Sequence, residues 1–325
     1  MSNIYTDLAL ESAEALTGAD SNGVFMTAEE TQNTVITRVR VTDDKGAELL
    51  GKPIGNYITI ESQGMKENDI TVHEEIIKIL SDEIAVLIEK AKKRSENSLV
   101  FIVGLGNRNV TPDALGPRVV SKVLVTRHIM GDISTREGMT VRPVSVLSPG
   151  VMGTTGIETY DIIDGICKKT KPALVIAIDA LAARCTSRIN ATIQISDTGL
   201  CPGAGMNNSR KAVTEEFLGV PVIAVGVPTV VDAATLVSDT MDIMLDSMIN
   251  ELPEGSEFLE MLKSLEDREK YSVIKRALDP YAGNMFVTPK EVDAVMDRLS
   301  NIIANAINIS LHPGIDKDDI NRFMY

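Results

Sequence analysis

The sequence predicts an α/β protein with a doubly wound, mostly parallel sheet flanked by helices. Four short runs rich in Val, Ile, Leu and Ala indicate its central strands, and each ends at or beside Gly, Ser or Asp. They are residues 99–104, 141–147, 173–179 and 220–226. Segments long enough for a crossover helix separate these runs, which favours parallel strands with right-handed connections. Because such sheets bind ligands beyond the carboxyl ends of their strands, the loops after the four runs are the expected walls of a site.

The N-terminal third is predicted to hold an arm, two strands and a helix. Residues 1–33 are polar and acidic, which is typical of a flexible arm with at most one short helix, around Leu8–Leu16. Alternation of β-branched and charged residues then indicates half-exposed strands over residues 34–42 and 56–62, on either side of a turn near Asp43–Gly46. Over residues 73–94, apolar side chains recur at intervals of three and four, which predicts an amphipathic helix.

Helical spacing of apolar residues recurs between and after the central strands. It predicts helices over residues 115–130, 156–170 and 230–249. Beyond residue 252 the composition turns polar and helical. We therefore expect a helical C-terminal part, residues 253–325, packed on the α/β domain of residues 34–252.

The sequence of this C-terminal part also specifies where one helix begins. Thr288 offers an N-cap hydroxyl, Pro289 suits the first helical position, and Glu291 completes a capping-box pattern. The helix is therefore expected to start there and to run to about Ile309.

Charge and composition exclude several classes of partner. The 325-residue chain has 32 Lys and Arg against 46 Asp and Glu, a formal net charge of −14, so DNA and anionic membranes are repelled at long range. Aromatic residues make up 4% and Trp is absent, which leaves no stacking surface for bases. No basic and apolar leader opens the sequence, and no stretch reaches the roughly 18 apolar residues of a membrane span. We therefore expect a cytoplasmic protein that binds neither nucleic acid nor membranes.

Cysteines and histidines are too few and too scattered to suggest a metal or disulfide framework. The three cysteines form no CxxC pair, and the three histidines form no HExxH pattern; they are Cys167, Cys185, Cys201, His73, His128 and His312. No cofactor and no metal are expected. The acid and base groups of any chemistry must then be mostly carboxylates.

A Gly-rich loop follows the first central strand, in the segment GLGNRNVTPDALGP at residues 104–117. The dinucleotide fingerprint fails here because Asn109 stands where its third glycine would be, and no Gly-Lys-Ser/Thr follows for a phosphate loop. Gly104 and Gly106 are instead candidates for lining a cleft. The loop carries Asp113, just before the expected helix start at Leu115, where a helix N-terminus favours a carboxylate.

The third central strand ends in Asp179, after an otherwise apolar run. An aspartate at this position can cap the next turn, but Asp113 and Asp179 both follow parallel strands at the carboxyl edge of one sheet, so both can face the same crevice. Two such carboxyl groups can hydrolyse a bond by acid–base chemistry without histidine, and a peptide bond is one suitable target. The same pair can instead ligate a divalent metal that activates water.

Each of three further residues near this edge of the sheet can have one of two roles. Asn107 can donate a hydrogen bond to a substrate carbonyl or oxyanion, although a turn-stabilising role is the commoner one. Thr229 and Asp232 follow the fourth central strand, where they can line the cleft or cap the helix that begins near Val230. We prefer the capping reading for these two.

Five ordered blocks of the sequence resemble the bacterial spore germination protease family. They are GLGNRNVTPDALGP, SPGVMGTTGIET, KPALVIAIDALAAR, TIQISDTG and VIAVGVPTVVDAAT, and the resemblance covers nearly the whole chain. It implies an endopeptidase that degrades the small acid-soluble proteins coating DNA in dormant spores, made in the spore interior as a self-processing zymogen and assembled as a homotetramer. The essential aspartates of the family fall on Asp113 and Asp179, and its processing segment places the self-processed bond at Asp7–Leu8.

GLGN followed by an acidic residue and Gly116 is also similar, more faintly, to the peptidases that mature nickel hydrogenases. That resemblance implies a related fold, with carboxylates and a histidine holding a metal. Here no histidine follows Asp179 until His312, which favours a metal-free pair of aspartates. A metal-dependent maturation-type peptidase or other metallohydrolase is the alternative, and a nucleotide-binding or non-catalytic scaffold is the third hypothesis.

Overall fold

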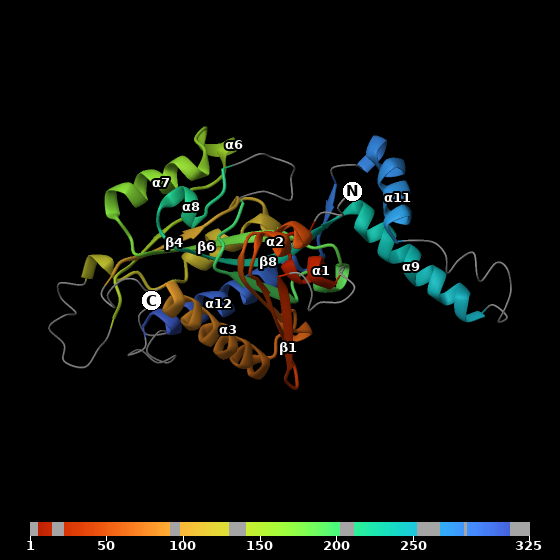
Figure 1. The fold of residues 1–325 in the computed structure, drawn as a ribbon, viewed down its shortest axis with the longest axis horizontal. Coiled ribbons are helices and arrows are strands. Elements are labelled where there is room, and N and C mark those ends of the chain that lie inside the picture. The colour runs from red at the N-terminus through yellow and green to blue at the C-terminus, as the bar shows by residue number, and fades with distance from the viewer. Residues whose placement is uncertain are drawn as a thin grey trace.

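The computed structural model describes residues 6–14, 23–91, 98–129, 141–201, 211–251, 267–282 and 285–312. Its centre is a mixed sheet with helices on both faces (Figure 1). Within the described residues the strand order is β1-β2-β3-β7-β8-β6-β4-β5, and β9 pairs with β8. None of the helices in these ranges combines the length and apolar character needed to cross a bilayer.

Four of the strands form the predicted parallel half of the sheet. They are β4 (Val100–Gly104), β5 (Val144–Leu147), β6 (Leu174–Ala182) and β8 (Val222–Asp232). β4 pairs in parallel with β5 and β6, and β6 pairs in parallel with β8. The four apolar runs therefore predicted the central strands correctly, because strands covered on both faces need apolar side chains throughout.

The other half of the sheet is antiparallel. It consists of β1 (Val24–Glu30), β2 (Val35–Val41), β3 (Gly55–Glu61) and β7 (Thr192–Ser196), and β7 joins it to β8. β1 was not expected, yet all seven of its residues pair with β2. The expected turn at Asp43–Gly46 is instead the start of α2 (Asp44–Leu50), because the Asp43 carboxylate caps this helix by accepting from the Gly46 N–H at 2.8 Å.

The N-terminal region contains the short helix expected around Leu8–Leu16, but this helix is packed against the sheet and is not part of a flexible arm. Residues Ala9–Glu14 form α1, and Ala9 and Ala13 pack against Val24 and Val39 in a small core of their own. The composition of this region is polar, but its few apolar residues are enough to bury one side of a short helix.

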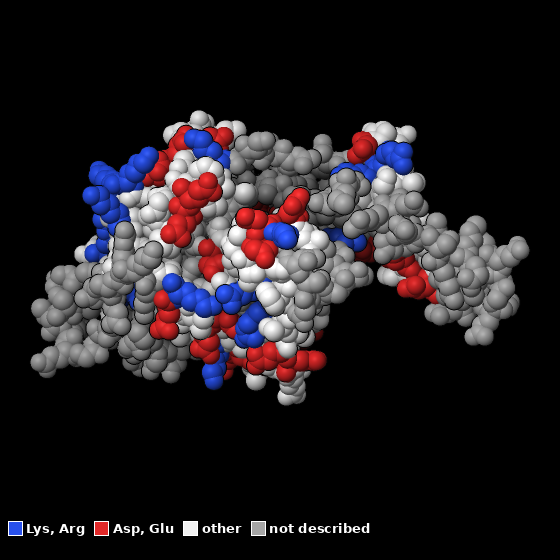
Figure 2. Space-filling model, in the orientation of Figure 1, with Lys and Arg blue, Asp and Glu red and all other residues white. Residues whose placement is uncertain are grey.

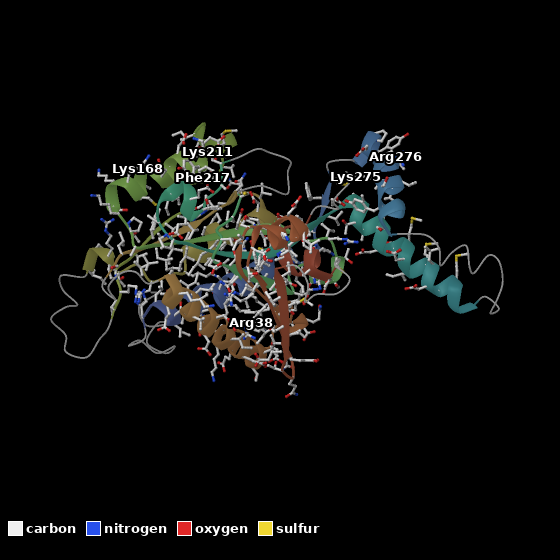
Figure 3. All side chains as sticks on the ribbon, in the orientation of Figure 1. Arg38, Lys168, Lys211, Phe217, Lys275 and Arg276 are labelled. Carbon is white, nitrogen blue, oxygen red and sulfur yellow. The ribbon has the colours of Figure 1, made fainter. Side chains whose placement is uncertain are left out.

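Helices α3 (Ile70–Ala91), α4 (Leu115–Val120) and α12 (Val292–Leu311) cover one face of the sheet and close its largest core (Figure 1). α4 is much shorter than the helix expected over residues 115–130. The chain leaves the helix because the Leu124 N–H donates to Asn308 Oδ1 of α12 at 2.9 Å, and the Thr126 hydroxyl donates to the Arg142 carbonyl at 2.5 Å. The Arg38 side chain of β2 also bridges to this layer, through ion pairs with Glu83 of α3 and with Glu29 of β1 (Figure 3).

Helices α6 (Met152–Thr155), α7 (Thr159–Thr170) and α8 (Glu215–Leu218) lie on the opposite face (Figure 1). There Ile163 and Cys167 of α7 pack on Phe101 and Val175 of the sheet. α7 lies within the helix predicted for residues 156–170.

The described residues beyond 252 are mostly helical, and α9 (Ala233–Glu251) precedes them. α9 and α11 (Asp267–Ala282) pack together and project from one end of the sheet (Figure 1). Strand β9 (Phe286–Val287) then leads to α12. Thr288 does not cap α12, which begins at Val292, because the Thr288 hydroxyl donates instead to the Thr229 carbonyl at 2.9 Å. On the face shown in Figure 2, acidic and basic side chains are interspersed over the described surface.

Candidate active site

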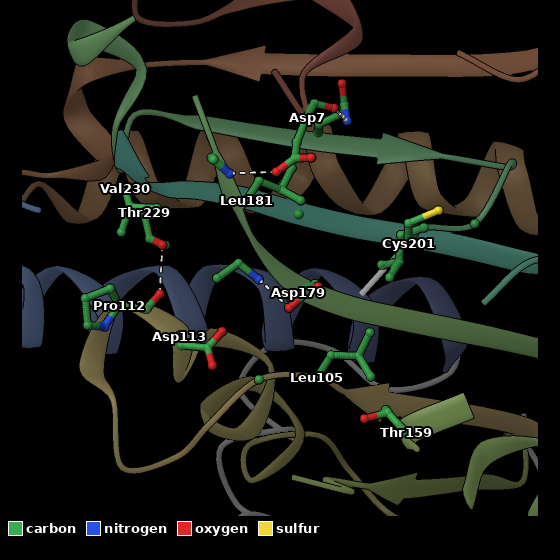
Figure 4. Close-up of a pocket in the computed structure, with 18 of the residues that line it drawn as sticks. Asp7, Leu105, Pro112, Asp113, Thr159, Asp179, Leu181, Cys201, Thr229 and Val230 are labelled. Carbon is green, nitrogen blue, oxygen red and sulfur yellow. Dashed lines mark hydrogen bonds between the residues drawn. The ribbon is translucent and has the colours of Figure 1, made fainter. Parts of the chain in front are cut away.

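A cavity of about 820 Å³ lies at the carboxyl edge of the parallel strands (Figure 4). All four of the loops expected to wall a site contribute to it. Their lining residues include Leu105 and Gly106 after β4, Gly150 and Val151 after β5, Asp179 to Ala182 of β6, and Thr229 of β8. The position of this cavity agrees with the general rule for open α/β sheets.

Asp113 reaches the cavity from the loop after β4. It ends a short 3-10 turn, η2 (Thr111–Asp113), and its half-buried carboxylate accepts the Asn107 N–H at 2.7 Å through Oδ2. The loop closes on Asp113 only because residue 106 is glycine. Gly106 has a φ of +106°, and a Cβ there would lie 2.0 Å from the Asp113 carbonyl oxygen.

Asp179 lies within β6 and not at its end, because β6 continues to Ala182. Its side chain is 5% exposed, and Oδ1 accepts the N–H of Ala180 at 2.9 Å. The neighbouring strand β4 stops at Gly104, which pairs with Ile178. The edge of the sheet therefore opens at the residue that carries the carboxylate.

The loop after β4 is fixed directly beside Asp179. The Leu105 N–H donates to the Ile178 carbonyl at 2.8 Å, one residue before Asp179. Asp113 and Asp179 consequently line the same cavity, as their positions on the predicted sheet suggested (Figure 4). Gly104 does not line it, because it faces α4, where a Cβ would lie 2.2 Å from the Gly116 carbonyl oxygen.

The remaining predicted residues divide between lining and support. Asn107 lines the cavity, while its side-chain Oδ1 accepts the Asn109 N–H at 3.0 Å, so the side chain also stabilises its own turn. Thr229 lines the cavity and does not cap a helix, so the capping preferred for it was wrong, because β8 continues to Asp232 and α9 begins only at Ala233. The Thr229 hydroxyl donates to the Pro112 carbonyl at 2.7 Å, which ties β8 to the turn that carries Asp113.

Asp232 caps a helix, which was our preferred reading, and it is not among the cavity residues. Its Oδ1 accepts the Thr235 N–H at 2.6 Å in the first turn of α9, and its Oδ2 accepts the Tyr271 hydroxyl of α11 at 2.6 Å. This residue therefore joins the projecting helix pair to the end of β8.

The N-terminal segment, which bends at Asp7, also lines the cavity through that residue, which the sequence did not predict. The Asp7 N–H donates to the Ala182 carbonyl at 3.3 Å, and the Ala182 N–H donates to Oδ2 of Asp7 at 2.8 Å (Figure 4). The next residue, Leu8, is fully buried against Ala183, Ile189 and Val231. The chain around Asp7 is therefore attached to the end of β6 at Ala182.

Two polar side chains hold the backbone of this segment, and sequence reasoning missed both. Lys52, just after α2, donates through Nζ to the Thr6 carbonyl at 3.0 Å and to the Asp7 carbonyl at 3.1 Å. Gln194 of β7 donates through Nε2 to the Asp7 carbonyl at 3.2 Å and accepts the Ala9 N–H through Oε1 at 2.6 Å. Both line the cavity, and nothing in their local sequence signals this role.

Burial changes the ionisation of two groups in the cavity wall. Desolvation lowers the pKa of the Lys52 ammonium below its ordinary value, although the nearby Asp7 charge opposes this. Desolvation also raises the pKa of Tyr57 to about 12, and its hydroxyl donates to the Pro53 carbonyl at 2.7 Å. Among the described residues, no group of three or more His, Cys, Asp and Glu side chains is placed to hold a metal ion.

Two carboxyl groups on the wall of one cavity, at the carboxyl edge of parallel strands, define by class an α/β protein with a candidate hydrolytic site. The chain belongs to the germination protease family. The model of this family, described as Germination protease, matches residues 5–257 and 246–324. It is 46% identical to the germination protease of Clostridium acetobutylicum over all of both chains, and 45% identical to that of Caldanaerobacter subterraneus subsp. tengcongensis over 99% of this chain and 98% of the other.

Two more distant likenesses complete the comparison. The germination protease of Bacillus thuringiensis subsp. konkukian is 43% identical over 99% of this chain and 97% of its own. Among solved structures, a NiFe hydrogenase maturation protease, HycI, from Thermococcus kodakarensis matches 65% of this chain and 92% of its own, with 15% identity and a TM-score of 0.31.

Proposed function

We propose that this protein is an endopeptidase that degrades small acid-soluble, DNA-binding proteins inside the germinating spore, with Asp113 and Asp179 as its general acid and base. The observation that carries the proposal is the placement of both carboxyl groups on the wall of the same cavity, which Asp7 of the N-terminal segment also lines. Membership of the germination protease family supports the substrate class.

In the proposed reaction one carboxyl group is ionised and the other is protonated. The ionised group takes a proton from water as the water oxygen attacks the carbonyl carbon, and the protonated group gives its proton to the carbonyl oxygen. The resulting tetrahedral diol collapses as the C–N bond breaks. The leaving nitrogen takes a proton from one carboxyl group, and a diol hydroxyl returns a proton to the other. The pair ends with one proton, as it began.

Cleavage of a small acid-soluble spore protein by the purified chain tests this role. We expect the wild type to cut the substrate internally, and we expect Asp113→Asn and Asp179→Asn to cut it at least ~10²-fold more slowly. A variant with near-normal turnover would remove that aspartate from the mechanism. A wild type that leaves the substrate intact would overturn the substrate class.

We also propose that the chain is a zymogen that cuts its own Asp7–Leu8 bond. The position of Asp7 in the cavity wall supports this, because Asp7 lines the same cavity as the candidate acid–base groups, and Lys52 and Gln194 hold the carbonyl of the Asp7–Leu8 bond. The departing piece of about seven residues is too short to fold as an inhibitory domain. It would instead block the cavity locally, as Asp7 does here.

Incubating the full-length protein and sequencing its new N-terminus tests self-processing. We expect Leu8 as the first residue in the wild type and no cleavage in Asp113→Asn. A new terminus beyond residue 34, or the same terminus at equal rate in the variant, would contradict the proposal.

Assembly as a homotetramer is the last part of the proposal. Exposed apolar side chains along α9, Leu236, Met241, Ile243, Met244 and Met248, support a contact surface there, since soluble monomers rarely expose large apolar patches. Light scattering is expected to give four times the 35.1 kDa chain mass. A monomer at micromolar concentration would contradict it.

A further inference from the structure

Lys52 and Gln194 both donate hydrogen bonds to the carbonyl oxygen of Asp7, at 3.1 and 3.2 Å. That oxygen belongs to the Asp7–Leu8 peptide bond. We propose that the Lys52 ammonium and the Gln194 side-chain amide bind the carbonyl of the bond being cut and stabilise the negative charge that develops on its oxygen as water attacks, before the protonated carboxyl group gives that oxygen its proton, in self-processing and in the substrate. The inference rests on the proposed function, because it assigns new residues to the same reaction.

The contacts of these two side chains fit any peptide backbone. Gln194 brackets Leu8, because it donates to the carbonyl before this residue and accepts the N–H after it, at Ala9. Lys52 spans two successive carbonyls, those of Thr6 and Asp7. The Thr6 and Asp7 carbonyls leave with the N-terminal piece, while Ala9 stays on the chain, so a main-chain carbonyl of the substrate can then take their place on both donors.

The sheet register places Gln194 on the same face as Asp179. Gly226 of β8 pairs with Asp179 on one side and with Gln194 on the other, and side chains at paired positions point to the same face. Two strand spacings put the two backbones roughly 10 Å apart. The Leu181 side chain of β6 covers Gly226, so the Gln194 amide and the Asp179 carboxyl group lie on either side of Leu181 on this face.

Burial strengthens the interaction of the Lys52 ammonium with a negatively charged oxygen. The cavity wall buries Lys52 enough to lower its pKa, and a desolvated ammonium interacts more strongly with a developing oxyanion than a solvated one does. A charge-assisted bond is also about twice as strong as a neutral one. Loss of one such donor from an oxyanion site typically reduces kcat by about 10²–10³-fold.

Two substitutions remove the donors with little change of shape. Lys52→Met keeps the length of the side chain without the ammonium. Gln194→Glu keeps the acceptor for the Ala9 N–H and removes the donor to the Asp7 carbonyl. Their matched controls are Lys66→Met and Gln63→Glu, because both of those side chains donate to the Ser187 carbonyl, at 3.3 and 3.4 Å, outside the cavity.

Each full-length variant is assayed for kcat and KM on a small acid-soluble spore protein and for the rate of Asp7–Leu8 cleavage. We expect kcat and the self-cleavage rate to fall about 10²-fold in Lys52→Met and Gln194→Glu, with KM changed much less, and both controls to match the wild type. Lys52→Arg, which retains a charged donor, is expected to recover part of the loss.

The possible failures of the experiment are distinguishable. If the wild type cuts normally and both cavity variants keep kcat within threefold, or change KM alone, the assignment of Lys52 and Gln194 to the oxyanion is wrong. If the wild type cuts neither bond, the proposed function itself fails. If the unfolding midpoint shows that Lys52→Met does not fold, Gln194→Glu and Lys52→Arg replace it as the test. A wild-type kcat in Gln194→Glu then overturns the assignment.

Discussion

The backbone N–H of Asn107 donates a 2.7 Å hydrogen bond to Oδ2 of Asp113. The donor is fixed by the Gly-rich loop after β4, and the acceptor belongs to the turn that closes the same loop. The orientation of the Asp113 carboxyl group is therefore set by main-chain geometry, six residues away in sequence, as well as by its own turn. This relationship determines which substitutions test the chemistry without disturbing the fold.

The first prediction concerns the charge of the two aspartates. Asn at position 113 can still accept the Asn107 N–H through its amide oxygen, and Asn at position 179 can still accept the Ala180 N–H. We expect both Asp→Asn variants to fold with an unfolding midpoint close to that of the wild type, while kcat falls at least ~10²-fold. Denaturant titration beside the cleavage assay checks both. A variant that loses activity together with its stability would show a structural role instead.

The second prediction concerns the close approach of Gly106 to Asp113. A Cβ at residue 106 would lie 2.0 Å from the Asp113 carbonyl oxygen, at a positive φ that side chains rarely adopt. Gly106→Ala should therefore displace the loop, reduce activity and destabilise the fold by roughly 1–3 kcal/mol. Gly153→Ala is the matched control, because Gly153 also lines the cavity and a Cβ there meets nothing within 4 Å. Equal activity of the two variants would contradict the expected strain.

The third prediction concerns pH and His312, which is fully buried at the end of α12. Burial and the charge of Arg142 lower the pKa of His312 from 6.5 to about 4. Below pH 6.5 the unfolded chain binds a proton at this residue and the folded chain does not. Stability is therefore lost as the pH falls from about 6.5 to about 4, by up to about 3 kcal/mol.

Urea unfolding of the wild type and of His312→Gln at pH 7 and pH 4 measures this loss. Gln is uncharged and keeps an acceptor for the Arg142 N–H, which donates to Nδ1 of His312 at 3.3 Å. We expect the free energy of unfolding to fall about 3 kcal/mol further in the wild type between these pH values. The carboxylates titrate in both proteins, so their contribution cancels. If the free energy of unfolding falls equally in the wild type and in His312→Gln, His312 is not the cause of the pH dependence.

The fourth prediction concerns metal removal. The acid–base mechanism proposed for Asp113 and Asp179 needs no Lewis acid, and no histidine precedes His312 after the Asp179 segment. Exhaustive dialysis against a chelator should leave most of the cleavage rate. Loss of activity that one added divalent metal restores would instead favour the metallohydrolase alternative.

The pattern of residues along the chain determined the α/β class and the edge where the site lies. The strands β4, β6 and β8 are buried on both faces, so their sequences must be apolar throughout, and Asp113 and Asp179 stand out because each follows or interrupts such a run. These are local signals of composition and spacing. They are therefore readable without the structure.

Only the tertiary structure showed which other residues line the cavity with these two carboxyl groups. Asp7 meets Ala182, 175 positions further along the chain, and Lys52 and Gln194 converge on its carbonyl from a loop and from an antiparallel strand. Their neighbouring residues resemble ordinary surface and strand sequence. Hydrogen bonds between such distant residues depend on the register of the whole sheet, and a residue's neighbours in sequence do not specify that register.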